Sequence, residues 1–483
     1  MMGLRELLAD QTLPEVSLSN MTLDSRDVQP NMTFIAIPGA ERDGRDFIHA
    51  ALELGAGVVL AEADDRELPE DDRVIAISGL KDQLGVLADR FYRSPSCQLK
   101  VMAVTGTNGK TSIVELTRQL LQAVGLKAGS IGTLGSRLAG PPTEVRNTTP
   151  DCITLHRQLR VWRDAGVDYV AMEASSHALD QRRLDGLKID VAVFTNLSRD
   201  HLDYHHSMEA YGESKFKLFR DFASSVQIYN ADDSVLSSQS DIWGRDSVGI
   251  SFSDESADVL IGMISVAPLA FTVRTPWGNA QIDSLLAGRF NAFNLTVAIV
   301  ATASMGVSFA EIIEVTQQLK PVPGRLEPME MTSDITVVID YAHTPDALQN
   351  VMMTINEIQE GKSELITVVG CGGNRDKGKR PMMASEAARC SNRVVLTSDN
   401  PRNEEPQTII DDMLEGLTPE GRRKTLVIVD RREAIRTAIA LAQKDDVILI
   451  AGKGHEDYQI IKGIKHHFDD REEVRACFTN LKA

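Results

Sequence analysis

One short segment of this chain, residues 104–112, limits the possible folds more than any other. It reads Val-Thr-Gly-Thr-Asn-Gly-Lys-Thr-Ser, and it lies between an apolar run over 101–104 and a helical pattern over 113–117. A strand, a glycine turn and a helix N-terminus in this order form a cradle for phosphate, because the N–H groups of the turn and the helix dipole face the same anion. The segment therefore predicts an α/β fold with a nucleotide site at a strand end.

The residue types in this turn each suit phosphate binding. Gly106 and Gly109 let backbone N–H groups turn toward the anion. Lys110 adds a full positive charge, and Thr111 is placed to offer its hydroxyl to a magnesium ion. A strict P-loop begins with glycine where this chain has Val104, so the match is to a shortened variant. The alternative is a glycine-rich strand–helix turn whose lysine is solvated.

The rest of the chain alternates short apolar runs with helical patterns, which is typical of parallel sheets covered by helices. Breaks at 94–96 (Ser-Pro-Ser) and 321–325 (Pro-Val-Pro-Gly-Arg) divide it. We predict three α/β domains: a small N-terminal domain over 1–98, a central parallel-sheet, P-loop-like domain over 99–325, and a C-terminal doubly wound, Rossmann-like domain over 326–483. The stretch 259–273 is expected to form antiparallel strands. Other expected strands are Thr33–Ile37, Val58–Ala61, Val74–Ile77, Val101–Val104, Tyr169–Glu173, Val191–Thr195, Gln227–Tyr229, Thr336–Asp340, Leu365–Val369, Val394–Thr397, Leu426–Val429 and Val447–Ala451, and expected helices include Phe47–Leu54 and Lys81–Phe91.

Composition excludes several classes of protein. The 483 residues suffice for roughly three domains of about 150 residues each. A formal net charge of −18, from 51 basic and 69 acidic residues, argues against nucleic acid or an anionic membrane as the main partner. Five scattered cysteines without a Cys-x-x-Cys pair favour reduced thiols, and no apolar run approaches the ~18 residues of a membrane span. We expect a soluble, cytoplasmic monomer that binds small molecules.

Two strand ends in the central region carry polar side chains. Glu173 closes the expected strand 169–173 and is placed to bind magnesium opposite Thr111; the alternative is a carboxylate that caps the next helix. The loop over 195–206 contains Asp200, His201, Asp203, His205 and His206. Several ligands in one loop could hold a second metal or orient a substrate, whereas the alternative is a solvated histidine.

Two further segments leave their roles open. Lys215 lies beside aromatic residues in a helical pattern, where an amphipathic surface residue is an equally good interpretation. Asn291 and Asn294 precede an alanine-rich helix, and they could read an adenine edge or merely cap that helix.

The C-terminal region has four polar loops, each next to an expected strand. They span 340–346, 370–380, 398–402 and 452–457 and are rich in Arg, Asp and Gly. Arginine binds a carboxylate in a fork while acidic groups bind an ammonium, so such loops suit a small zwitterion. Four of them at one sheet edge favour a binding site over solvated turns.

Taken together, these segments closely resemble the Mur ligase family over essentially the whole chain. The segments that carry the resemblance are Leu23–Arg26, Asp43–Arg45, Thr105–Thr111, Asn147–Pro150, Glu173–His177, Asp200–Asp203, Asp340–Pro345, Asp399–Arg402 and Gly452–Tyr458. The resemblance implies ATP-dependent amide ligation, in which a substrate carboxylate attacks the γ-phosphate, an acyl phosphate forms and an amine displaces phosphate. Asp399-Asn400-Pro401-Arg402 looks like the signature of members that add meso-2,6-diaminopimelate to UDP-N-acetylmuramoyl-L-alanyl-D-glutamate in peptidoglycan precursor synthesis.

Residue roles follow by motif from the resemblance. Lys110, Lys215, Glu173 and His201 are the implied catalytic residues. The implied ATP-binding residues are Gly106, Thr107, Asn108, Gly109, Lys110, Thr111, Ser112, Asn294, Arg325 and Asp340. Two magnesium ions are implied at Thr111, Glu173, His201 and Lys215, the last as a carbamate. The implied contacts to the UDP-muramyl dipeptide are Leu23, Ser25, Asn147, Thr148, Thr149, Ser175, Gln181 and Arg183. The implied diaminopimelate contacts are Arg375, Asp399, Asn400, Pro401, Arg402, Gly452 and Glu456.

One loop departs from the pattern, and two rival functions remain to be tested. Ala40-Glu41-Arg42 stands where some family members carry His-Gln-Ala, which leaves nucleotide contacts there to the backbone. A folylpolyglutamate synthetase would explain the phosphate loop and Lys215, but not the first hundred residues or 399–402. A nucleotide-gated binding or transport-coupled module would leave the four polar loops unexplained.

Overall fold

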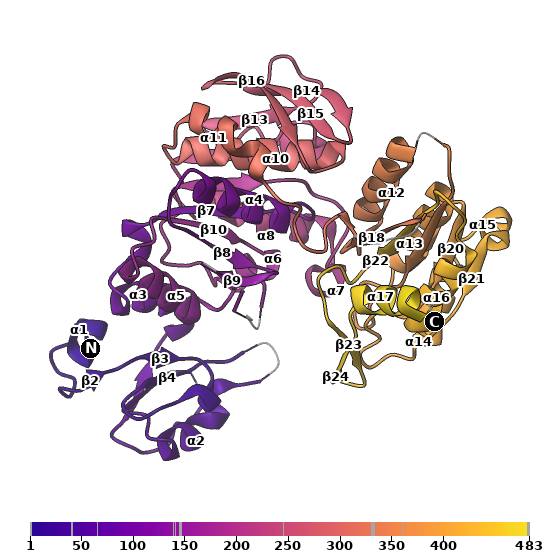
Figure 1. Ribbon diagram of the computed structural model, residues 1–483. Coiled ribbons are helices and arrows are strands. Elements are labelled where there is room, and N and C mark those ends of the chain that lie inside the picture. Colours follow the sequence, from indigo (N-terminus) through magenta and orange to yellow (C-terminus); the bar gives the residue numbers. More distant parts are fainter. Residues whose placement is uncertain are drawn as a thin grey trace. The chain divides into compact units, whose positions relative to one another are not determined.

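The computed structural model describes residues 2–39, 42–64, 66–138, 140, 142–143, 147–244, 246–329, 334–359 and 361–480 (Figure 1). It divides into two compact units. Unit 1 consists of Met1–Ala103, Lys127–Asp190 and Lys217–Ser225, and unit 2 consists of Val104–Leu126, Val191–Phe216 and Val226–Ala483. Strand β7 (Lys100–Thr105) and helix α8 (Met208–Arg220) contribute residues to both units. The predicted domain boundaries after residues 98 and 325 remain predictions.

The N-terminal part of unit 1 is a four-stranded parallel sheet in the order β3-β4-β5-β6. Its central strands consist mostly of apolar residues and are buried on both faces, as expected of a parallel sheet. Two apolar clusters, one with Leu60 and Leu84 and one with Val59 and Ile48, cover the two faces. The elements are β1 (Met2–Gly3), α1 (Leu4–Leu8), β2 (Ser17–Leu18), β3 (Met21–Thr22), β4 (Thr33–Ala36), α2 (Ile48–Glu53), β5 (Val58–Glu62), β6 (Val74–Ile77) and α3 (Leu80–Phe91).

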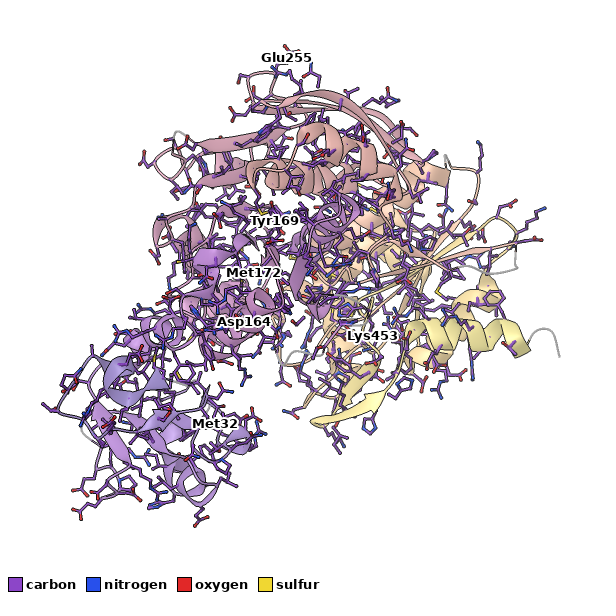
Figure 2. The ribbon with its side chains drawn as sticks, turned by 60° about the vertical axis from the view of Figure 1, so that its left-hand side comes forward. Met32, Asp164, Tyr169, Met172, Glu255 and Lys453 are labelled. Atoms are coloured by element: carbon purple, nitrogen blue, oxygen red, sulfur yellow. The ribbon has the colours of Figure 1, made fainter. Side chains whose placement is uncertain are left out.

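The remainder of unit 1 pairs β10 with β8 in parallel and β8 with β9 in antiparallel orientation. Its elements are β8 (Ala128–Gly132), β9 (Gly135–Arg137), α5 (Cys152–Asp164), β10 (Tyr169–Glu173) and α6 (Ser176–Asp180). Two polar residues start the helices, because Asp151 accepts a hydrogen bond from the N–H of Thr154 and Ser175 accepts one from the N–H of Ala178. Figure 2 labels Met172 on β10, one residue before Glu173.

Unit 2 begins with the phosphate-loop helix and a run of neighbouring strands. Strands β11 to β14 are parallel, and β14, β15 and β16 form an antiparallel meander, which confirms the expectation for 259–273. Helix α10 is apolar nearly all round and therefore almost wholly buried, packed against α4. The elements are α4 (Lys110–Ala123), β11 (Val191–Phe194), α7 (Leu202–His205), β12 (Val226–Asn230), α9 (Ser234–Ser237), β13 (Ser247–Ser251), β14 (Val259–Val266), β15 (Leu269–Thr275), β16 (Gly278–Ser284), α10 (Arg289–Ser304) and α11 (Phe309–Val315).

The C-terminal part of unit 2 is a six-stranded sheet in the order β17-β18-β22-β19-β20-β21, parallel except for β17. Alternate residues face opposite layers: Val338 packs with α12, α13 and α14, whereas Val337 and Ile339 pack with α16 and α17. This is the predicted doubly wound arrangement. The elements are β17 (Glu327–Pro328), β18 (Thr336–Asp340), α12 (Pro345–Gln359), β19 (Leu365–Val369), α13 (Lys379–Cys390), β20 (Arg393–Leu396), α14 (Pro406–Leu414), α15 (Pro419–Arg423), β21 (Thr425–Val427), α16 (Arg431–Leu441), β22 (Val447–Ala451), β23 (Tyr458–Ile461), β24 (Ile464–His467) and α17 (Asp470–Asn480).

Two features were not predicted from the sequence. Strands β23 and β24 form an antiparallel hairpin after the last strand of the sheet. Helix α10 begins at Arg289, so Asn291 and Asn294 lie inside it rather than before it. Within the described part of the chain, no helix is both long and apolar enough to cross a membrane.

Candidate functional site

The phosphate loop packs so closely against its neighbours that a side chain at either of its two glycines would have to displace neighbouring atoms. Gly106 has φ +138° and Gly109 has φ +90°, backbone conformations that side-chain-bearing residues rarely adopt. A Cβ at Gly106 would overlap the hydroxyl of Thr195, and a Cβ at Gly109 would lie 2.8 Å from Oδ1 of Asn294. The turn is therefore packed closely against the residues that follow β11 and against α10.

The positive and polar groups of the loop are held by the loop itself and by the turn that follows β11. Nζ of Lys110 donates to the carbonyl oxygens of Gly106 (2.7 Å) and Thr107 (2.8 Å). The backbone N–H groups of Thr107 and Asn108 donate to Asn196, at its carbonyl oxygen and its Oδ1, both at 2.9 Å. The Lys110 ammonium is thus held at the turn that is predicted to bind phosphate.

Residues from the C-terminal part of unit 2 reach the same loop. Arg325 donates to Oγ1 of Thr111 at 2.8 Å, and its guanidinium lies 4.5 Å from the centre of the Tyr341 ring. Nε of Arg325 is buried and has no acceptor within the described ranges. Asn108 donates to the carboxylate of Asp346 at 2.8 Å. The structure therefore brings together Thr111, Asn108 and Arg325 from the predicted nucleotide set.

Asp340 and Asn294, the other two distant members of that set, are also buried in unit 2. Asp340 accepts the backbone N–H groups of Leu326 and Ala342, and burial raises the pKa of its carboxyl. Asn294 donates to Oδ1 of Asn291 at 3.3 Å inside α10. Gly288 occupies the start of this helix, so the alternative that these asparagines cap it is wrong.

Lys215 is buried, which excludes its interpretation as an amphipathic surface residue. Its side chain is 1% exposed, and Nζ donates to the carbonyl oxygen of Gly106 at 2.8 Å. The ammonium lies 4.4 Å from the centre of the Tyr211 ring. Burial, followed by the charge of Lys110, holds the pKa of Lys215 well below its usual value. A lysine with this environment is available as a neutral amine, the form that reacts with carbon dioxide.

Asp200, one of the polar residues that the sequence placed in the loop over 195–206, is the centre of a buried charge cluster. Nζ of Lys379 lies 3.1 Å from its Oδ1, and Nε2 of His201 and of His343 lie 3.4 Å and 3.6 Å from its Oδ2. Burial alone would raise the pKa of the Asp200 carboxyl, but the charge of Lys379 and the contact with His343 hold it well below its usual range. His201 has a left-handed backbone, with φ +55°, at the start of α7.

Glu173, the predicted magnesium ligand, belongs to unit 1. It ends β10 with its side chain buried, and it accepts hydrogen bonds from the backbone N–H (2.7 Å) and the hydroxyl (3.2 Å) of Thr133. The next helix is capped by Ser175, so the alternative of Glu173 as a helix cap is wrong.

Four of the predicted dipeptide contacts form one hydrogen-bonded group in unit 1. Arg183 donates to the carbonyl oxygen of Thr149 (2.9 Å) and to Oε1 of Gln181 (2.6 Å). Thr149 in turn donates to Ser175 at 3.4 Å, and Thr148 lies 3.3 Å from the Thr133 hydroxyl. The other predicted contacts are Asn147, which is exposed, and Leu23 and Ser25, which flank the residue that caps a short 3₁₀ turn. Ala40 and Glu41 lie outside the described residues.

The predicted amino-acid pocket is formed by loops at the carboxyl ends of β19, β20 and β22. Asn400 donates to Oε2 of Glu456 at 2.9 Å. Burial, followed by the charge of Asp399, raises the pKa of Glu456. Gly452 closes the turn after β22 with φ +113° and would place a Cβ 3.3 Å from Oδ2 of Asp399. The pocket thus contains buried carboxylates that an ammonium could bind.

Two arginines supply the opposite charge. Arg402 donates to the carbonyl oxygen of Gly373 at 2.8 Å and is half-buried. Burial and the charge of Arg375 lower the pKa of Arg402, so an incoming carboxylate would relieve repulsion between two cations. Arg402 also has φ +52°, a left-handed backbone in a residue that carries a side chain. Pro401, which lies between Asn400 and Arg402 in the sequence, is buried.

The loops of this pocket approach each other at glycines. A Cβ at Gly370 would overlap the carbonyl oxygen of Thr397, and one at Gly373 would overlap that of Pro401. The loops after β19 and β20 are therefore in backbone contact.

Sequence reasoning missed Lys453, Tyr211, Lys379 and His343 as parts of these sites. Lys453, which Figure 2 labels, is fully buried beside Asp399 and Glu456. Its signal was its place in the polar loop 452–457, but burial cannot be read from a loop composition. Among the residues that the structure describes, no three His, Cys, Asp or Glu side chains converge as for a metal ion.

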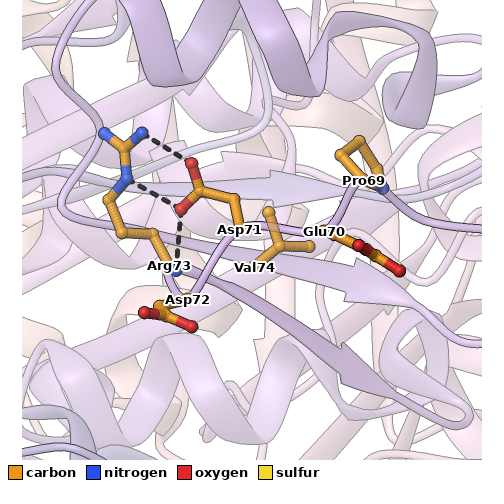
Figure 3. A pocket seen from close by; sticks show the side chains of 6 residues that line it. All are labelled: Pro69, Glu70, Asp71, Asp72, Arg73 and Val74. Carbon is orange, nitrogen blue, oxygen red and sulfur yellow. Dashed lines mark hydrogen bonds and ion pairs between the residues drawn. The ribbon is translucent and has the colours of Figure 1, made fainter.

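A pocket in unit 1 contains none of the predicted site residues. It is lined by Pro69, Glu70, Asp71, Asp72, Arg73 and Val74, and Arg73 forms an ion pair with Asp71 at 2.8 Å (Figure 3). Arg73 also donates to the carbonyl oxygen of Leu52 at 3.4 Å, so its guanidinium is bonded within the N-terminal part of unit 1.

Comparison with known proteins gives consistent similarities over the whole chain. Profiles described as the Mur ligase family catalytic domain, the Mur ligase middle domain and the Mur ligase glutamate ligase domain match residues 17–92, 104–302 and 324–454. The chain is 44% identical over 471 residues to the UDP-N-acetylmuramoyl-L-alanyl-D-glutamate–2,6-diaminopimelate ligase of Bacteroides fragilis, covering 96% of each chain. A solved structure of a ligase with the same name is 34% identical, with a TM-score of 0.68, and the match covers 100% of this chain and 99% of that chain. The MurF ligase of Thermotoga maritima, solved in complex with ADP, is 18% identical with a TM-score of 0.64 over 95% and 97% of the two chains, a likeness of fold alone.

Proposed function

The chain belongs to the Mur ligase family, and from that premise we propose that it joins meso-2,6-diaminopimelate to UDP-N-acetylmuramoyl-L-alanyl-D-glutamate, with conversion of ATP to ADP and phosphate. The observation that carries this function is the 44% identity to a ligase of that name over 96% of both chains. It is a step of peptidoglycan precursor synthesis. We place it in the cytoplasm, where ATP is available.

The reaction has two steps. An oxygen of the dipeptide carboxylate attacks the γ-phosphorus of ATP, the bond from that phosphorus to the ADP oxygen breaks, and an acyl phosphate forms. The amine of diaminopimelate then attacks the acyl carbon, phosphate leaves with the bonding electron pair, and the nitrogen loses a proton. Lys110 and the N-terminus of α4 stabilise the negative charge that spreads over the phosphoryl oxygens. Arg325 lies beside Thr111 and adds a second cation to the same place.

Magnesium fits the donor types of the predicted metal residues. Each would offer one donor, the hydroxyl of Thr111 and the imidazole of His201 in unit 2 and the carboxylate of Glu173 in unit 1, while phosphate oxygens and water complete the coordination. Magnesium takes most of its ligands from phosphates and water, so one or two protein groups per ion suffice. When bound, it neutralises charge on the phosphates.

A carbamate on Lys215 fits the burial of that residue. The neutral amine adds to carbon dioxide, forms an N–C bond and releases one proton, which converts a cation into an anion. The low pKa of Lys215 and the neighbouring charge of Lys110 favour this product. As a carbamate, residue 215 would offer two oxygens to the metal site; as an ammonium it would repel the metal.

The incoming amino acid has two carboxylates and two ammonium groups. Arg402 and Arg375 supply positive charge for one carboxylate, and Asp399 and Glu456 supply negative charge for an ammonium. Lysine lacks the second carboxylate. The hydrogen-bonded group of Thr149, Ser175, Gln181 and Arg183 would take the dipeptide.

The test is acceptor dependence. Phosphate release from ATP and magnesium should rise strongly only when both the UDP-muramyl dipeptide and meso-diaminopimelate are present. Equal turnover with glutamate as the added amino acid would identify a folylpolyglutamate synthetase. Steady turnover without either acceptor would identify a nucleotide-gated module.

A further inference from the structure

Lys453 is one of the largest fully buried side chains of the molecule, with 0% of its surface exposed. It follows β22 directly, in the turn that Gly452 opens. A buried lysine is costly unless its charge is paired and its hydrogens are bonded. The partners of Lys453 therefore indicate which part of the molecule its buried ammonium stabilises.

All its partners belong to the amino-acid pocket or to the hairpin beside it. Nζ donates to the carbonyl oxygen of Tyr458 (2.7 Å) and to Oδ1 of Asn400 (3.3 Å). It also forms ion pairs with Oδ1 of Asp399 (3.2 Å) and, more loosely, Oε2 of Glu456 (3.7 Å). Three of the seven residues expected to bind diaminopimelate thus share one cation, which is not itself among the seven.

The shared cation also determines the charge of the pocket. Burial would raise the pKa of Asp399, but the charge of Lys453 and then that of Arg431 bring it below its usual value. Glu456 is farther from the ammonium, and burial with the neighbouring Asp399 raises its pKa. Lys453 thus lies closer to the carboxyl group whose pKa is lowered, that of Asp399, than to the one whose pKa is raised, that of Glu456.

The same ammonium orients Asn400 and the hairpin β23–β24. Oδ1 of Asn400 accepts from Lys453 and from the backbone N–H of Ile460 (2.9 Å), which leaves its amide nitrogen to donate to Glu456. The N–H of Arg402 donates to the carbonyl oxygen of Ile460 at 2.9 Å. The side-chain amide of Asn400 cannot flip, exchanging its oxygen and nitrogen, without losing these bonds. The position of Arg402 therefore depends on Lys453 through three successive contacts, by way of Asn400 and Ile460.

We propose that Lys453 is a positioning residue for the incoming amino acid, whose buried ammonium holds Asp399, Asn400 and Glu456 in the orientation that selects diaminopimelate. The inference rests on the proposed function. Lys453 acts through these neighbours, and Arg402 remains the group that meets the second carboxylate.

The test compares Lys453→Met with Lys424→Met in steady-state kinetics of the full-length protein. Lys424 is in the same unit and donates to the carbonyl oxygen of Ser391, outside the predicted amino-acid pocket, so it controls for loss of a partly buried lysine. Lys453→Met should raise KM for meso-diaminopimelate by about 30-fold or more, since it leaves buried carboxylates unpaired. KM for ATP and for the UDP-muramyl dipeptide should stay within about twofold, and the preference over L-lysine should fall by about tenfold. Lys424→Met should leave all four quantities unchanged.

A second measurement separates this inference from the proposed function. Meso-diaminopimelate should raise the Tm of the wild-type protein and have no such effect on Lys453→Met. If Lys453→Met does not fold, Lys453→Gln, which keeps a polar end of similar length, takes its place. A folded variant with a lower Tm but an unchanged KM and an unchanged diaminopimelate-induced shift in Tm would give Lys453 a structural role only and overturn the proposal. Wild-type protein that binds diaminopimelate without ligating it would overturn the proposed function instead.

Discussion

The side-chain nitrogen of Lys215 lies 2.8 Å from the carbonyl oxygen of Gly106, so a buried lysine of helix α8 is hydrogen-bonded to the glycine turn that is predicted to bind phosphate. The turn already contains the charge of Lys110, and a second ammonium so close to it is electrostatically unfavourable. This position favours chemical modification of Lys215, because modification removes the charge that Lys110 repels.

Replacement of Lys215 by alanine should nearly abolish ligation, by about 100-fold or more, because the oxygens of the proposed carbamate would be lost. Short carboxylic acids such as acetate should restore part of the activity by supplying oxygens in the space left behind. The measurement is the rate of tripeptide formation with and without acetate.

Lys217→Ala is the matched control for this substitution. Lys217 lies two residues further along the same helix, is half-exposed and pairs with Asp180 at 2.9 Å. It should retain full activity and show no response to acetate. A fully active Lys215→Ala protein would return that residue to a purely structural role.

Replacement of Arg402 by alanine should raise KM for diaminopimelate by about 100-fold while changing KM for ATP by less than about twofold. The physical reason is that Arg402 is held by the Gly373 carbonyl and repelled by Arg375, so it gains most when a carboxylate arrives. Kinetics with diaminopimelate and L-lysine as competing acceptors provide the measurement. Arg389→Ala, which removes an exposed arginine paired only with Glu386, serves as the control. Unchanged discrimination between the two amino acids would show that another residue reads the second carboxylate.

Replacement of Gly109 by alanine should raise KM for ATP and lower stability by about 1–2 kcal/mol, because the residue has φ +90°. The new methyl group would also push against Oδ1 of Asn294, 2.8 Å away. Gly125→Ala provides a matched control: Gly125 has φ +86°, but a Cβ there meets nothing within 4 Å. It should lower stability by a similar amount and leave KM for ATP unchanged. Equal effects of the two variants on KM would mean that the loop tolerates the added group.

Asp43 should stabilise the N-terminal sheet in a pH-dependent way. Hydrogen bonds from Arg45 lower its pKa to about 2, below the ordinary value of 3.8. Since the folded-state pKa is the lower one, the contribution is complete above about pH 4 and is lost as the pH falls toward about 2. Asp43→Asn keeps the helix-capping oxygen, and it should lower the free energy of unfolding by about 1–2 kcal/mol at pH 7 and by almost nothing at about pH 1, below both pKa values.

Urea denaturation at several pH values provides the measurement for Asp43. Asp46→Asn removes an exposed carboxylate that pairs with Arg66, and its effect should stay within about 0.5 kcal/mol at every pH. An effect of Asp43→Asn that does not change with pH would assign its role to packing or capping.

The regular elements of this chain were predictable because they depend on local patterns. The apolar runs that became β18, β19 and β22 are buried on both faces, and such strands read as continuous hydrophobic segments. The meander over 259–273 could be predicted because short strands separated by a turn favour antiparallel pairing. The hairpin β23–β24 was missed because its strands are mostly exposed and one of them contains two histidines.

The charged groups of the site were harder to predict, since burial depends on contacts between distant segments. Lys215 has a sequence context typical of a helix surface, and only the packing of α8 near Gly106 places it in the interior. Asp200 acquires its charge state from Lys379, 179 positions later in the chain. Nothing local distinguishes Lys453 from the other basic residues of its loop.

The backbone contacts at Gly370 and Gly373 have a consequence for attempts to change which amino acid the protein accepts. Neither position has room for a single extra carbon atom, because the carbonyl oxygens of Thr397 and Pro401 already occupy that space. A change of amino-acid preference therefore requires substitution of the other side chains of the predicted pocket. Libraries that vary the two glycines would yield mostly misfolded protein. The same rigidity makes the spacing between these loops a fixed dimension against which a rigid amino-acid analogue can be designed.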